Sequence, residues 1–362
     1  MTTFGAELRA TSVGYAAEGF DTIQHLAQPG ASLVVTIKNT GQNSFRRRHR
    51  RGIRRGLGIV LGTTIAIPAM TVGSPHASHV ELFTVGRTAV SVEFPETQFV
   101  TGADSLLVWI RRSMNIVSAY YGRFPSRTLR IKLVADDGGG VHTGTTWGKE
   151  GGLIRLKVGQ DVTDTQMLND WVLVHEMTHL ALPDVGEAHA WLSEGLAVYI
   201  EGIERVQAGN RSEEDVFAEE LRSMPRGLPE AGDQGLDHTH TWGRTYWGGA
   251  MFCLLADVAI HRQTDNRFGL QDAMRAVLKG SGGLSSDWSI ERTFQTADLA
   301  TGTHVLEQLY AQMRDQPVTP DLAGLWAQLG IHGDGSTVSL SDDAPLADVR
   351  RAIMRPREHK DL

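Results

Sequence analysis

The sequence predicts an α+β protein in which a strand-rich half precedes a helical half. Residues 79–94 alternate apolar and polar side chains, as half-buried strands do. From Ala190 onward, apolar residues recur at helical spacing in one segment after another. With 362 residues and 41% hydrophobic content, the chain can bury a full core in one large or two small domains. We expect a ligand site where the two halves meet.

In the strand-rich half, residues 104–121 have helical spacing and residues 127–135 read as a strand. A glycine-rich turn follows, with Gly138 to Gly140 at its start, and leads into a further strand in 151–159. Residues 164–182 then predict one helix, with Asp164 as its cap and Pro183 as its end.

The helical half contains six segments with helical periodicity: 190–206, 212–224, 246–264, 270–280, 302–313 and 320–330. The single cysteine, Cys253, excludes both a disulfide framework and a cysteine-ligated zinc site within one chain, and we expect it in the core. The predicted regions are a leader at 1–45, a basic and apolar segment at 46–77, the strand-rich lobe at 78–160, the helical lobe at 161–340 and a tail at 341–362.

The basic and apolar segment has the layout of an export signal or a single N-terminal membrane anchor. Seven arginines and Lys38, with no acidic residue, fall within 22–79, and an apolar run occupies 56–72. Positive charge before the run would send everything after residue 77 across a membrane, so we expect an extracytoplasmic protein that is periplasmic or membrane-anchored in the cell envelope. Its late position leaves a long leader or a later translation start open. The acidic remainder of the chain argues against nucleic-acid binding.

The stretch "HEMTH" carries the candidate chemistry. His175 and His179 lie one helical turn apart, so both imidazoles can reach one ion. Glu176 projects to a neighbouring face, where it can reach a water beside that ion. Glu194 in "WLSEG" is the best third ligand, and His189 is a weaker rival. The alternative, two histidines without a metal, would leave polar groups uncompensated in an apolar helix.

With its surroundings, "HEMTH … WLSEGLAVYIE" resembles the gluzincin zinc metallopeptidases, in the glycyl aminopeptidase-like and leukotriene-hydrolase-like branch. The stretch 119–135 is similar to the passage that opens the family's catalytic domain, 151–159 to its substrate-lining edge strand, and 244–264 to its "YxKG" segment. The resemblance covers about residues 100–330. It implies a two-lobed, thermolysin-like domain with the active-site helix between the lobes, and Zn²⁺ on His175, His179 and Glu194.

The resemblance also implies Glu176 as general base, Tyr246 as the oxyanion donor, and Glu201 as a carboxylate that orients a zinc-bound histidine. The family's Gly-x-Met-Glu-Asn segment has no counterpart, so endopeptidase and aminopeptidase activity both stay open. His238, His240 and Arg244 precede Tyr246 and are more typical of structural or solvated roles.

The sequence therefore favours an exported zinc metallopeptidase acting on peptides or proteins. Two alternatives remain. One is a catalytically inactive envelope binding protein that retains the metallopeptidase fold, and the other is a membrane-tethered structural protein without metal.

Overall fold

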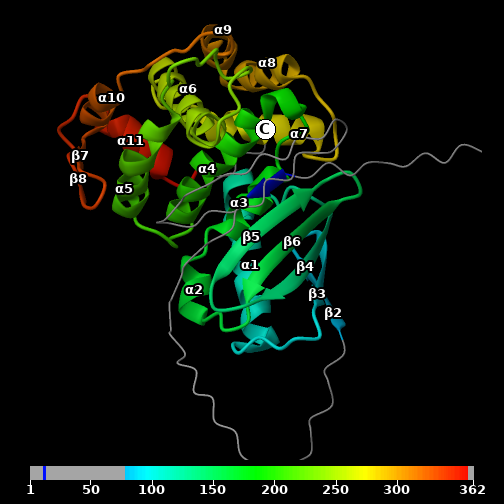
Figure 1. Cartoon of the computed structure of the whole chain (residues 1–362). Coiled ribbons are helices and arrows are strands. Elements are labelled where there is room, and N and C mark those ends of the chain that lie inside the picture. The colour runs from blue at the N-terminus through cyan, green and yellow to red at the C-terminus, as the bar shows by residue number, and fades with distance from the viewer. Residues whose placement is uncertain (1–10, 14–77, 358–362) are drawn as a thin grey trace, which may run out of the picture.

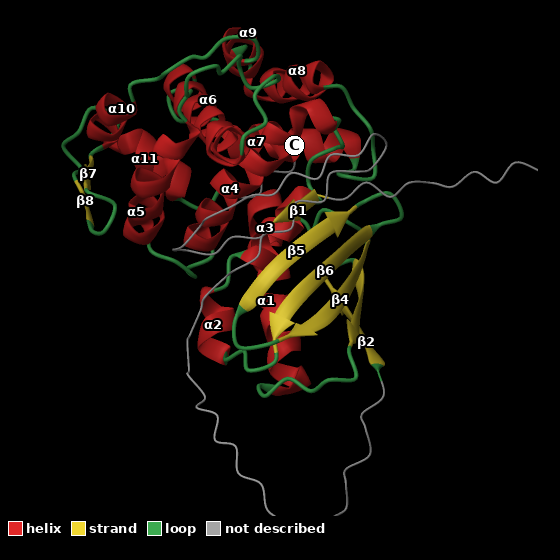
Figure 2. Cartoon of the chain, viewed as in Figure 1, coloured by secondary structure: helices red, strands yellow, loops and turns green. Residues whose placement is uncertain are grey.

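A mixed six-stranded sheet and a group of helices make up the computed structural model, which describes residues 11–13 and 78–357 (Figures 1 and 2). The strands of this sheet are β1 (Thr11–Val13), β2 (His79–Val85), β3 (Thr88–Phe94), β4 (Thr128–Asp136), β5 (Val141–Trp147) and β6 (Gly152–Gly159). A separate two-stranded sheet pairs β7 (Ile331–Gly333) with β8 (Val338–Leu340).

The strand order in the large sheet is β1-β5-β6-β4-β3-β2. Strands β2 and β3 form an antiparallel hairpin at Gly86, whose φ of 57° suits glycine. Strands β3, β4 and β6 run parallel, and β5 runs antiparallel to β6. Strand β1 pairs with the other side of β5, with Thr11 opposite Thr146.

The helices follow the sheet in sequence, except for the crossover helix between β3 and β4. They are α1 (Gly102–Tyr121), α2 (Asp164–Asn169), α3 (Val172–His179), α4 (Ala190–Gln207), α5 (Glu213–Ser223), α6 (Gly249–Gln263), α7 (Leu270–Ser281), α8 (Ile290–Thr301), α9 (Val305–Met313), α10 (Leu322–Leu329) and α11 (Ala347–Met354). The mixed α/β composition predicted from the sequence is confirmed.

Helix α3 lies where the sheet and the helical half meet, in contact with strand β5 and with helices α1 and α4 (Figure 1). Every residue of α3 is buried. Alternate residues of the strands, such as Ile131 and Leu133, are buried in the same hydrophobic core. The polar side chains of α3 are therefore shielded from water, and each needs a partner in the protein or a ligand.

Helices α4 and α6 meet at two glycines. A Cβ atom at Gly195 would lie 2.3 Å from the Cα atom of Gly249, so only glycine permits this approach. The contact holds the start of α4, which carries Glu194, against the start of α6.

The helix predicted over 164–182 is two helices in the structure, α2 and α3. The break occurs because the Asp170 carboxylate accepts hydrogen bonds from the backbone N–H groups of Val172 and Leu173, at 3.1 Å each, and so caps a new helix. Thr163, rather than Asp164, caps α2, and α3 ends at His179, before Pro183.

The glycine-rich stretch also differs from its prediction. Gly138 and Gly140 have φ values of 81°, as a turn requires, but the chain then forms strand β5. Because β5 pairs with β6 on the side opposite β4, β6 is an inner strand and not the edge strand that the resemblance implies. Helices α8 and α11 were not predicted from the periodicity.

The leader and the basic and apolar segment, residues 1–77, lie outside the described residues apart from β1. Among the helices of the described part, none has the length and apolar character that crossing a membrane requires. The tail predicted at 341–362 includes α11, whose Val349, Ile353 and Met354 pack in the core. Cys253 is buried, as predicted.

Candidate metal centre

Helix α3 presents two imidazoles on one face. His175 and His179 are one turn apart, and their ring centroids lie 4.8 Å from each other. The edge of Trp171 packs against the His175 ring at a centroid distance of 5.5 Å. The Asp170 cap fixes where this helix begins and therefore which way the two histidines point.

Helix α4 brings a carboxylate to the same point. Oε2 of Glu194 lies 3.5 Å from Nε2 of His175 and 3.4 Å from Nε2 of His179. All three residues are buried, with 5% exposure or less. Ser193, the residue before Glu194, places its hydroxyl 3.1 Å from Nδ1 of His179. Residues from two helices thus converge on one small volume.

The three facing atoms fit a metal ion. Nε2 of His175, Nε2 of His179 and Oε2 of Glu194 are buried, and none has a hydrogen-bond partner in the described part of the chain. Potential ligand atoms of the three residues lie within 4.8 Å of one another. Two imidazoles and a carboxylate are a typical donor set for catalytic zinc. Burying them without an ion would cost several kcal/mol, at roughly 1–3 kcal/mol for each unsatisfied group.

The pKa values of two of these residues favour the protonation state that binds a metal ion, which is neutral for histidine and ionised for glutamate. Burial lowers the pKa of His175 to about 4 against the opposing effect of Glu194, so the ring is neutral at pH 7. Burial alone would raise the pKa of Glu194, but His179 and His175 outweigh it and lower the pKa to about 2. For His179, burial is outweighed by Glu194 and Glu176, and its pKa is raised.

Glu176 lies beside the cluster and against strand β5. Its side chain is fully buried, and its Oε2 accepts a hydrogen bond of 2.5 Å from the Thr146 hydroxyl. Gly144 makes room for it, because a Cβ atom there would lie 2.3 Å from Cγ of Glu176. The candidate general base is therefore held between α3 and β5.

Tyr246 reaches the cluster from a π-helical turn, Arg244–Gly248, that leads into α6. Its ring stacks on Trp242 at a centroid distance of 5.7 Å. Burial, followed by the nearby carboxylates of Glu194 and Glu176, raises its pKa well above the usual value. The phenol therefore keeps its proton at physiological pH and can donate a hydrogen bond.

Comparisons with known proteins give no match at the level of sequence: no protein-family model matches the chain, and no curated protein does. The fold does have counterparts. An aminopeptidase N family protein from Idiomarina loihiensis is 14% identical with a TM-score of 0.54, and the match covers 70% of this chain and 49% of that one. An M1 zinc metallopeptidase from Deinococcus radiodurans is also 14% identical, with a TM-score of 0.44, over 68% of this chain and 52% of that one.

At this identity the similarity concerns the fold. The chain spans about half the length of these solved structures. The gluzincin resemblance agrees with this similarity at the level of the fold shared with the aminopeptidase N family protein, while the thermolysin-like and leukotriene-hydrolase-like assignments go beyond it.

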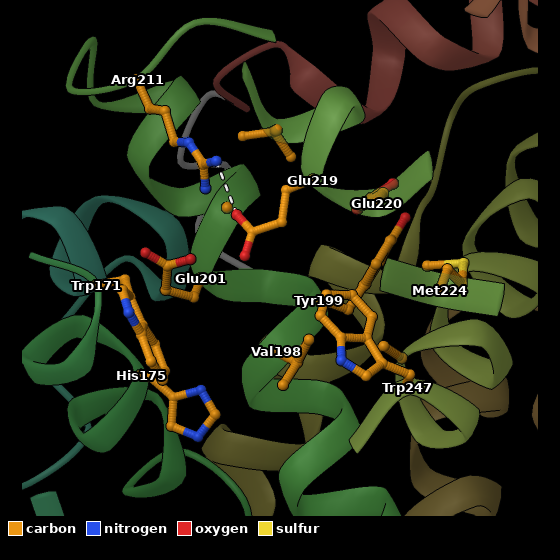
Figure 3. Close-up of a pocket in the computed structure, with 13 residues that line it drawn as sticks. Trp171, His175, Val198, Tyr199, Glu201, Arg211, Glu219, Glu220, Met224 and Trp247 are labelled. Atoms are coloured by element: carbon orange, nitrogen blue, oxygen red, sulfur yellow. Dashed lines mark ion pairs between the residues drawn. The ribbon is translucent and has the colours of Figure 1, made fainter. Parts of the chain in front are cut away.

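Glu201 does not take the position that the resemblance implies. Its Oε1 accepts a 2.8 Å hydrogen bond from Arg205, while Nδ1 of His175 has no partner among the described residues and Nδ1 of His179 contacts Ser193. Glu201 lines the same pocket as His175, where Figure 3 also shows the ion pair of Arg211. The Glu201 carboxylate thus pairs with Arg205 and not with a ring nitrogen of His175 or His179.

The remaining candidates lie in structural contacts. His189, the rival third ligand, places Nδ1 3.0 Å from Asp237. Arg244 forms a buried ion pair of 2.7 Å with Asp233. His238 pairs with Asp315 at an exposed site, and His240 is exposed. His189, His238 and Arg244 therefore each contact a carboxylate other than that of Glu194.

Three residues of the site were missed from the sequence: Ser193, Gly144 and Thr146. Ser193 had a local signal, since it directly precedes Glu194 and so belongs to the same turn of α4. Gly144 and Thr146 had none, because only the packing of β5 on α3 brings them to Glu176.

Proposed function

We propose that this protein is a gluzincin-type zinc metallopeptidase that hydrolyses peptide bonds, built on a two-lobed, thermolysin-like domain. The observation that carries the proposal is the convergence of three buried, unpartnered ligand atoms from His175, His179 and Glu194. The placement of Glu176 and Tyr246 beside that cluster, together with the similarity to zinc aminopeptidase folds, supports peptide hydrolysis as its use.

Zinc held by the three ligands would supply Lewis-acid chemistry, which activates water and polarises a scissile carbonyl. Glu176 would accept a proton from the attacking water and deliver it to the leaving amine. Tyr246 would donate its phenolic hydrogen bond to the oxyanion as the tetrahedral state develops. Burial of the site strengthens each of these interactions, because little water competes with them.

The proposal does not restrict the enzyme to free N-termini. Strand β5, which runs beside Glu176, carries the sequence VHTGTTW and has no carboxylate to bind a substrate's amino group. We therefore leave endopeptidase and aminopeptidase activity as outcomes of the substrate assay. An inactive envelope binding protein is less favoured, because simple binding needs neither Glu176 nor Tyr246 at the metal cluster.

We also propose that the protein acts outside the cytoplasm, in the periplasm or attached to the cell envelope by one N-terminal segment. The support is the arginine-rich stretch 46–55 followed by the apolar run 56–72. Fractionation of cells that express the full chain tests this. Recovery only in the cytoplasm would contradict it.

The function is tested with the full chain, loaded with zinc and incubated with a peptide library read by mass spectrometry. The Glu176→Gln variant is the control, because it keeps the shape of the side chain but removes the base. We expect cleavage by the parent, loss with a chelator, and a fall in turnover of roughly 10²- to 10⁴-fold in the variant. Equal turnover of parent and variant would contradict the mechanism.

A further inference from the structure

Strand β5 presents two buried residues to helix α3. Gly144 and Thr146 are two positions apart, so they lie on the same face of the strand, and both contact Glu176. Thr146 is 1% exposed. Its neighbour Thr145 lies on the other face and donates its hydroxyl to the carbonyl of Gly144 at 2.7 Å.

The Thr146 hydroxyl lies near two acceptors of the same residue. It is 2.5 Å from Oε2 of Glu176 and 3.0 Å from the backbone carbonyl oxygen of Glu176. A hydroxyl has one proton to donate. The contact to the carboxylate oxygen is the shorter of the two, and a carboxylate that acts as a base is also the stronger acceptor, because a charged acceptor about doubles the strength of a hydrogen bond.

We propose that Thr146 is a positioning residue for the general base. By holding Oε2, it fixes the rotamer of Glu176 and directs Oε1 to the reacting water. The absence of a side chain at Gly144 leaves the space that this rotamer needs. The inference rests on the proposed function, in which Glu176 transfers a proton.

The same contact serves both halves of the proton transfer. The proton of the attacking water moves to Oε1 of Glu176 and then to the nitrogen of the leaving amine, so none is left on the enzyme. The Thr146 proton stays on its hydroxyl throughout. Oε2 of Glu176 accepts the hydrogen bond from that hydroxyl before, during and after the transfer. Glu176 therefore keeps its orientation without a change of partner.

The test compares three variants of the full, zinc-loaded chain. Thr146→Val removes the hydroxyl at nearly constant shape, Thr146→Ser keeps it, and Thr145→Val is the control on the opposite face of the same strand. We expect kcat to fall roughly 10- to 100-fold in Thr146→Val, which is less than the fall expected when the general base itself is removed. KM should stay within about twofold of the parent value. Thr146→Ser and Thr145→Val should stay within about threefold of the parent.

A parent-like kcat in Thr146→Val would overturn the inference, as would an equal fall in Thr146→Ser. If Thr146→Val does not fold, the double variant Thr146→Val/Glu176→Met decides, since it removes both partners of the bond. A folded double variant supports the coupling of the two side chains. An unfolded one contradicts it.

A second measurement does not depend on activity. Crystal structures of zinc-loaded parent and Thr146→Val should show one position of the Glu176 carboxylate in the parent and a displaced or divided one in the variant. An unchanged, single position would overturn the inference. If the parent binds zinc but cleaves no peptide, the proposed function fails, while this comparison still tests whether Thr146 holds Glu176.

Discussion

Two polar clusters, one buried and one partly exposed, lie along helix α4, and their charges are compensated in different ways. The metal cluster consists of His175, His179 and Glu194, whose facing atoms have no hydrogen-bond partner in the described chain. The arginine-paired cluster begins two turns further along α4. There Glu201 pairs with Arg205 at 2.8 Å, and Glu219 with Arg211 at 2.7 Å.

The comparison shows that burial of charge is not by itself the sign of a ligand site. In the arginine-paired cluster, the chain supplies its own cations, so the carboxylates are satisfied without a ligand. In the metal cluster, two imidazoles and a carboxylate point at one another, and no lysine or arginine of the described residues pairs with that carboxylate. An ion is the simplest partner for that arrangement.

The largest expected effect concerns the donor beside the metal cluster. Tyr246→Phe should lower kcat by roughly 10- to 1,000-fold, because one oxyanion donor is lost, and it should leave the zinc content unchanged. The control is Tyr199→Phe, which removes a buried hydroxyl that donates to Asp257 at 3.0 Å, away from the cluster. Steady-state kinetics on one peptide would check both. Equal rates for parent and Tyr246→Phe would remove Tyr246 from the mechanism.

A smaller effect separates the two clusters directly. Ser193→Ala removes the hydroxyl beside Nδ1 of His179 and should weaken zinc binding about 10-fold, as loss of a group that orients a ligand does. Glu201→Gln disturbs only the pair with Arg205, so zinc affinity should change by less than about threefold. Competition with a chromogenic chelator measures both. The reverse order would return Glu201 to the role that the family resemblance gives it.

A third effect concerns stability rather than activity or zinc binding, and it belongs to Glu220, next to the arginine-paired cluster. Burial, with a further contribution from Glu219, raises its pKa from 4.5 to about 8. The folded protein therefore binds a proton that the unfolded chain has lost, and stability decreases as pH rises from about 5 to about 8. Glu220→Gln cannot ionise, so it should become more stable than the parent by about 2–4 kcal/mol at pH 8.

Thermal or urea unfolding at pH 5 and pH 8 measures this difference. Glu219→Gln is the matched control, since Glu219 is more exposed and paired with Arg211. The difference in unfolding free energy between variant and parent should grow from pH 5 to pH 8 for Glu220→Gln and stay constant for Glu219→Gln. A constant difference between parent and Glu220→Gln across this range would show that Glu220 is ionised in the folded protein.

The sequence was most informative where the site is local. His175, Glu176 and His179 lie within one and a half turns of α3, and Glu194 lies in the second turn of α4, so their spacing brought them into one hypothesis. The break between α2 and α3 at Asp170 was missed, because a capping carboxylate inside a helical pattern looks like part of the helix.

Side-chain contacts between residues far apart in the chain could not be predicted from the sequence. Thr146 and Glu176 are 30 residues apart, and their contact depends on how β5 packs on α3. Glu201 shows the opposite case, since its spacing from Glu194 suggested a contact with a metal-binding histidine, whereas its Oε1 accepts a hydrogen bond from Arg205, one turn further along α4. Helix α8, with the sequence IERTFQTADLAT, was missed because its three threonines favour helices weakly.

The most direct test of the central claim is the zinc content of the purified full chain, measured by mass spectrometry of the metal, beside Glu194→Ala. The account predicts about one zinc per folded parent chain and a clear loss in the variant, whose fold is checked by circular dichroism. A well-folded parent that binds no zinc, or a Glu194→Ala variant that retains it fully, would contradict the assignment of His175, His179 and Glu194 as a metal centre.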